Sequence, residues 1–166
     1  MAKAENIVRG SYRNIVDTYN NASESSIAEG KVWYSQANHI AWQVTKLLDS
    51  KDIRVGAGII AALSPQMDWG ENVTEALRFV SVGYSIKQTR ANMKAKRISE
   101  GEDPDTILGG LKVTAFYHAI LEPFGDTPPV IDSHGQAIYS GKPVSKRDRN
   151  RAFSNPRVIR RMQTSN

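Results

Sequence analysis

The chain has 166 residues, 40% of them hydrophobic, no cysteine and a formal net charge of +5. A chain of this length can fold around a single hydrophobic core, so we expect one domain. Without cysteine it cannot form a disulfide, a zinc–thiolate site, the cysteine-containing zinc site of nucleobase deaminases or an iron–sulfur cluster. Its three histidines are scattered. We therefore expect no metal and no cofactor.

No apolar run approaches the roughly 18–20 residues that are needed to cross a bilayer. The first ten residues, MAKAENIVRG, contain no apolar segment of the kind found in signal peptides. These two observations predict a cytoplasmic protein without a membrane partner.

Apolar residues three and four positions apart predict helices over about 4–19 and 28–50. The second helix carries an apolar stripe made of Trp33, Ala37, Ile40, Ala41, Val44 and Leu48. We expect this stripe to face the core, and both Trp33 and Trp42 to be buried there.

Residues 55–63 are almost all apolar or small, which is typical of either a buried strand or a buried helix. Because no other segment alternates like a strand, a central helix is favoured, with neighbours packed closely against Gly56 and Gly58. Pro65 ends this segment. Asp68 is then expected to cap a helix over about 69–80.

The remaining pattern is also helical, so the sequence predicts an all-α protein. We expect a basic helix around 91–98, a short helix opened by Asp103 and Pro104, and helices over about 112–121 and 132–139. Gly101, Gly109, Gly110 and Gly141 separate these elements. His39 and His118 fall on helices and are expected to be structural.

Residues 1–141 are therefore predicted to form a helical domain, and 142–166 a basic, poorly structured arm. Between Lys142 and Arg161 there are eight basic residues and one acidic residue, a net charge of about +7. Such an arm suits a polyanion such as DNA, because neutralising phosphates releases counterions. The alternative is a solvated tail that keeps the protein soluble.

Three parts of the chain, in the same order, resemble the helix-hairpin-helix DNA glycosylase superfamily, of the endonuclease III type. They are GIIAALSPQ (58–66) with Asn72 after it, NMKAKRI (92–98), and LGGLKVTA (108–115) followed by VIDSH (130–134). Together they span about 55–141. The GGLKV variant also resembles small proteins of actinobacterial phages, which implies a viral protein in the cytoplasm of a bacterial host.

This resemblance implies a glycosylase-like helical fold, double-stranded DNA as the partner, and Asp132 as the catalytic carboxylate. The residues that it places on DNA are Gly109, Gly110, Lys112, Gln66, Asn72, Lys94, Lys96, Arg97 and His134. Lys112 is also a candidate catalytic amine. The implied activity is that of a DNA N-glycosylase, which serves DNA repair or DNA modification.

Asp132 is chemically suited to this role. Cleavage of an N-glycosidic bond builds positive charge on the sugar, and a nearby carboxylate stabilises that charge and orients the attacking water. The apolar pair Val130–Ile131 would hold Asp132 in place, and a helix start favours its ionised form. The alternative is that Asp132 is only a helix N-cap.

The family's lysine, which forms a Schiff base with the sugar, aligns with Val113, so an active enzyme would be monofunctional. Lys112 lies one residue away, and either reaches the site or is a surface lysine. The hairpin also lacks its second glycine, because Leu111 and Lys112 stand there, which weakens its approach to phosphate.

These departures leave other functions open. One is a catalytically inactive protein on the same fold that binds DNA or a host protein, with a homodimer as a possible assembly. Another is an enzyme of phage DNA base hypermodification, since transfer to a flipped base would use the same carboxylate as hydrolysis.

Overall fold

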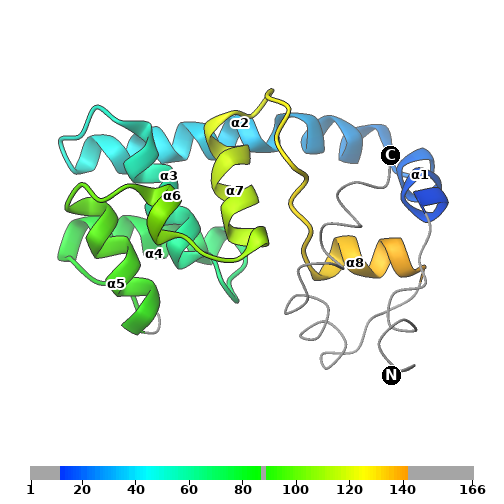
Figure 1. The fold of residues 1–166 in the computed structure, drawn as a ribbon. Coiled ribbons are helices and arrows are strands. Elements are labelled where there is room, and N and C mark those ends of the chain that lie inside the picture. Colours follow the sequence, from blue (N-terminus) through cyan, green and yellow to red (C-terminus); the bar gives the residue numbers. More distant parts are fainter. Residues whose placement is uncertain (1–11, 87–88, 142–166) are drawn as a thin grey trace, which may run out of the picture. The chain divides into compact units, whose positions relative to one another are not determined.

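The computed structural model describes residues 12–86 and 89–141, and within these ranges every regular element is a helix. The helices are α1 (Tyr12–Asn20), α2 (Glu24–Leu47), α3 (Ile53–Leu63), α4 (Trp69–Val82), α5 (Thr89–Ser99), α6 (Pro104–Ile107), α7 (Leu111–Leu121) and α8 (Ser133–Ser140) (Figure 1). The predicted all-α class is confirmed. The predicted basic arm over 142–166 and the start of the first predicted helix lie outside the described residues.

The chain divides into two compact units. The central unit is Val32–Pro128, and the terminal unit combines the chain up to Lys31 with the chain from Pro129 onward. The boundary near residue 31 falls within α2.

Helix α3 is the centre of the central unit. Eight of its eleven residues are buried, from Gly56 to Leu63, and it contacts α4, α5, α6 and α7 (Figure 1). Burial on all sides explains why its sequence shows no polar face. The segment is thus the buried helix that the sequence favours, and not a strand.

Two glycines of α3 allow its neighbours to approach closely. A Cβ at Gly56 would lie 2.1 Å from the Ala41 carbonyl oxygen of α2, and the Gly56 N–H donates to Thr45 Oγ1 at 3.1 Å. A Cβ at Gly58 would lie 2.9 Å from a ring carbon of Pro104. The predicted close packing at both glycines is confirmed.

Aspartates open four of the helices. Asp52, Asp68, Asp103 and Asp132 have extended backbones, and each accepts a hydrogen bond from a backbone N–H of the helix that follows. Capping of this kind satisfies donors that have no partner within the helix. The N-caps predicted at Asp68, Asp103 and Asp132 are therefore confirmed.

The apolar stripe of α2 is confirmed, but one tryptophan is not in the core. Trp33 packs against Tyr34, Trp69 and Phe116, with ring centroids 4.8–6.2 Å apart. The expectation that Trp42 is buried is wrong, because 38% of it is exposed. Trp42 is next to Ala41 in the sequence but lies at the edge of the apolar stripe, on a side of α2 that faces solvent.

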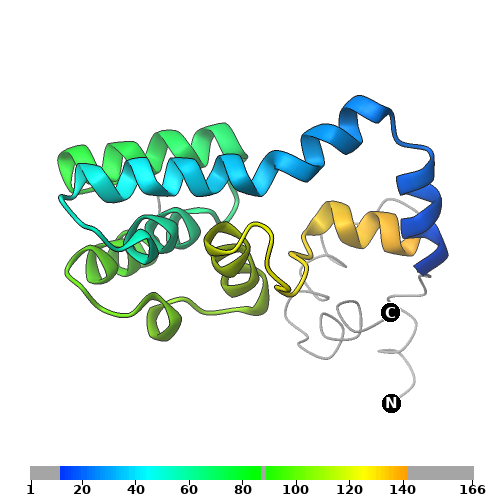
Figure 2. The ribbon, with the colours of Figure 1, turned by 90° about the horizontal axis from the view of Figure 1, so that it is seen from above.

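In the terminal unit α1 packs beside α8, as Figure 2 shows for the blue and orange helices. Asn14 of α1 donates from Nδ2 to the carbonyl oxygen of Tyr139 in α8, at 3.0 Å. Gly141 ends α8 with a left-handed backbone, as predicted.

A membrane-spanning helix is absent from residues 12–86 and 89–141, since none of their helices is both long and apolar enough.

Replacing Gly56 with alanine is expected to destabilise the protein by about 3 kcal/mol or more, because the new methyl group would overlap backbone atoms of α2. The matched control is Gly30→Ala, inside helix α2, where a Cβ would meet no atom within 4 Å. Alanine there is expected to stabilise by about 0.5–1 kcal/mol. Thermal unfolding followed by circular dichroism measures both, and a Gly56→Ala protein as stable as wild type would contradict the packing.

Candidate functional site

A groove of about 240 Å³ opens on the central unit. Its lining residues are Ala62, Pro65, Gln66, Arg90, Ala91, Lys94, Leu108, Gly109 and Val113. They come from three separate stretches of the chain: the end of α3 with the turn after it, helix α5, and the hairpin before α7 with the first turn of that helix. Each stretch contains one of the segments on which the glycosylase resemblance rests.

Gln66 lies on the turn after α3. It is exposed and has a left-handed backbone with φ of 61°, which is uncommon for a residue other than glycine. This backbone turns the chain from α3 toward Asp68, the cap of α4. Gln66 is also one of the residues that line the groove, a position from which a ligand can be contacted.

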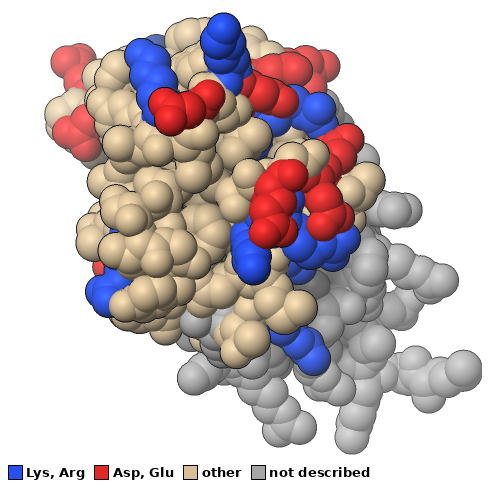
Figure 3. Space-filling model, turned by 90° about the vertical axis from the view of Figure 1, so that its left-hand side faces the viewer, with Lys and Arg blue, Asp and Glu red and all other residues tan. Residues whose placement is uncertain are grey.

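The predicted basic cluster on α5 is split by the structure. Lys96 pairs with Glu100 at 3.7 Å, and Arg97 donates to Glu102 at 2.7 Å. On the face of the molecule in Figure 3, blue and red atoms accordingly lie next to one another in several places. Lys94 and Arg90 line the groove instead, and in the described part of the chain neither has an ion pair or hydrogen bond.

The Gly109–Gly110 hairpin forms one side of the groove and leads into α7. A Cβ at Gly109 would lie 3.6 Å from Lys94 Nζ, so the lysine ammonium group rests over this glycine. Gly110 is the N-cap of α7, with φ of 85° and no side chain to accept from the first N–H groups. This end of α7 thus combines backbone N–H groups that no N-cap side chain satisfies with a nearby cation, which suits an anion.

Val113 and Lys112 are the two positions at which the resemblance raises a Schiff-base amine, and they lie in different surroundings. Val113, aligned with the family's lysine, lines the groove with an apolar side chain. Lys112 is exposed in the first turn of α7, where the structure contains no acidic residue. Lys112 is not among the groove residues.

Asn72 is buried and has a structural contact. It is 2% exposed, and its Nδ2 donates to the carbonyl oxygen of Ile60 at 3.0 Å. Ile60 lies in the last turn of α3, where carbonyl groups lack partners within the helix. Asn72 therefore joins α4 to the end of α3, and this burial favours a structural role over contact with DNA.

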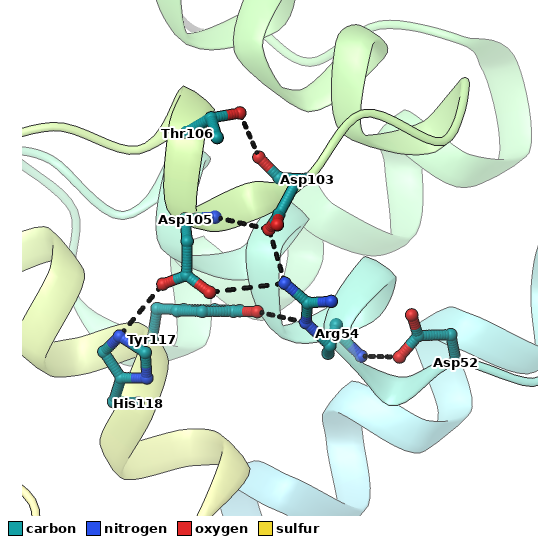
Figure 4. Close-up of polar contacts among 7 residues, drawn as sticks. All are labelled: Asp52, Arg54, Asp103, Asp105, Thr106, Tyr117 and His118. Atoms are coloured by element: carbon teal, nitrogen blue, oxygen red, sulfur yellow. Dashed lines mark hydrogen bonds and ion pairs between the residues drawn. The ribbon is translucent and has the colours of Figure 1, made fainter.

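A polar network that the sequence did not indicate joins α3, α6 and α7 (Figure 4). Arg54 of α3 donates to Asp103, to Asp105 at 3.3 Å and to the hydroxyl oxygen of Tyr117 at 3.2 Å. His118 of α7 contacts Asp105 at 3.0 Å, a contact in keeping with the structural role expected for it. Burial raises the pKa of Tyr117. Because Nε and Nη2 of Arg54 together join residues of three helices, we interpret this network as structural.

Asp132 belongs to the terminal unit, as the N-cap of α8. Its Oδ1 accepts from the backbone N–H groups of His134 and Gly135, both at 2.9 Å. Its Oδ2 has no hydrogen-bond partner within the described ranges. The Asp132 carboxylate is half-buried. The two hydrogen bonds to Oδ1 fix its orientation. The His134 side chain is exposed one residue into the helix.

These features define a small helical protein with a cationic, glycine-edged groove on one unit and a fixed carboxylate on the other. The chain belongs to the family DUF7178, a family of unknown function, whose sequence model matches residues 1–156. No curated protein and no solved structure matched the chain.

Proposed function

We propose that this protein binds double-stranded DNA and acts as a monofunctional DNA N-glycosylase on a helix-hairpin-helix glycosylase-like fold. In this proposal the central unit holds the DNA backbone through the groove, and Asp132 of the terminal unit supplies the carboxylate for hydrolysis of a damaged or modified base. DNA is thus the expected partner.

The observation that carries the proposal is the convergence at the groove. Gln66, Lys94 and Gly109 are 28 and 15 positions apart in the sequence, and all three line it. The resemblance implies a DNA contact at each of these three residues, and a shared groove is consistent with that role. Two unpaired cations beside an uncapped helix start also suit a backbone phosphate.

The carboxylate suits the chemistry for a separate reason. The N–H groups of His134 and Gly135 hold Asp132 Oδ1 and so orient the carboxylate. Oδ2 then remains available to a sugar that develops positive charge, or to an attacking water. Val113 stands where the family's lysine would be, and valine has no amine that could form a Schiff base. We therefore propose a monofunctional activity.

A second candidate function is DNA binding without catalysis. The observation in its favour is that both hydrogen bonds of Asp132 are those of an ordinary N-cap. On this alternative the groove would still hold DNA, and Asp132 would be structural.

Replacing Lys94 with glutamine is expected to weaken duplex DNA binding by about 3–10-fold and to reduce the salt dependence by about one phosphate contact. The matched control is Lys96→Gln, which removes the same charge two residues away from a lysine already paired with Glu100. The control should change affinity by less than about 2-fold, since exposed pairs contribute little. Fluorescence anisotropy at several salt concentrations measures both variants; equal losses would mean that net charge alone matters, and would contradict a role for the groove.

Replacing Asp132 with asparagine is expected to lower base release by about 100-fold or more while leaving the fold intact, because asparagine caps helices as well as aspartate. The control is Asp68→Asn, which changes the N-cap of α4 in the same way and should retain activity. The assay is release of free base from a panel of duplexes with damaged, modified or mismatched bases. No release by wild type across the panel would leave binding without catalysis, and full activity of Asp132→Asn would contradict the role proposed for this carboxylate.

A further inference from the structure

Gln136 is a buried amide without hydrogen-bond partners. It is 1% exposed, and within the described ranges neither its Oε1 nor its Nε2 has a hydrogen-bond partner. A glutamine amide offers one acceptor and two donor hydrogens. Burying these groups unpaired costs free energy, so folded proteins rarely leave them so. An apolar side chain of the same size would serve a core better.

Gln136 shares a helix face with Asp132. The two are four residues apart at the start of α8, and the Gln136 N–H donates to the Asp132 carbonyl oxygen at 3.0 Å. Side chains on a helix tilt toward its N-terminus, so we expect the Gln136 amide to lean toward the turn that Asp132 opens. Gly135, between them, adds no side chain to this face.

We propose that Gln136 is a specificity-determining residue, whose unpaired amide reads the hydrogen-bonding edge of the nucleobase on which Asp132 acts. This inference rests on the proposed function. Nucleobase edges present donors and acceptors side by side, and a primary amide matches such a pair with two hydrogen bonds. Because the amide is 1% exposed, this proposal requires that binding of the base displaces the residues that cover it.

The first test compares the thermal stability of the whole protein with that of Gln136→Met, which keeps the volume and removes the polar groups. If the amide is unpaired without its ligand, the variant should melt about 2–6 °C higher than wild type. The control Gln36→Met changes an exposed glutamine of α2 and should leave the melting temperature within about 1 °C. A lower melting temperature for Gln136→Met would overturn the proposal, because it would mean that the amide has structural partners.

The second test adds 2′-deoxynucleosides at millimolar concentration, namely the four standard ones and those of the damaged or modified bases in the release panel, and measures the melting temperature again. At least one should stabilise wild type and fail to stabilise Gln136→Met, since a ligand raises stability according to its affinity for the folded state. If none stabilises wild type, or if the variant responds equally, Gln136 does not read a base. Nucleoside binding without base release would leave this inference standing while the proposed catalysis fails.

Discussion

The contact between α3 and its neighbours is the constraint on which the rest of the central unit depends. Gly56 lets the backbone of α2 lie against α3, and Gly58 admits the ring of Pro104. Because α3 is held from several sides, its end is fixed, and with it the turn that carries Gln66. The same packing places α5 and the start of α7 around Ala62, so the groove is a consequence of how closely α3 is enclosed.

Charge pairing, more than net charge, decides which basic residues are available to a partner. Arg97 and Lys96 are engaged by acidic residues a few positions further along the chain. Arg54 is engaged by α6 and Tyr117. Lys94, on the same helix, has no ion pair with any residue that the structure describes. The sequence alone does not distinguish it from its basic neighbours. A surface with mixed charge can in this way present a small cationic site without a broad positive field.

Local patterns predicted much of the fold, and long-range contacts could not be predicted. The burial of α3 and the N-caps at Asp68, Asp103 and Asp132 follow from neighbouring residues. The ion pair of Arg54 joins residues 49 positions apart, and no single-sequence pattern indicates such a pair. The pairing of Lys96 with Glu100, by contrast, is a local i,i+4 contact of the kind that the sequence pattern does indicate. The orphan amide of Gln136 depends on burial, which its residue type does not predict.

We propose that DNA is held at the groove. Hydrogen–deuterium exchange, measured with and without a duplex, tests this proposal most directly. DNA binding at the groove is expected to slow exchange in peptides that cover the turn at 64–66, helix α5 near Lys94, and residues 109–113. Peptides that cover Arg54 and Asp103 should not change, because these residues do not line the groove. Protection confined to 142–166, or no protection at the three groove segments, would contradict the account.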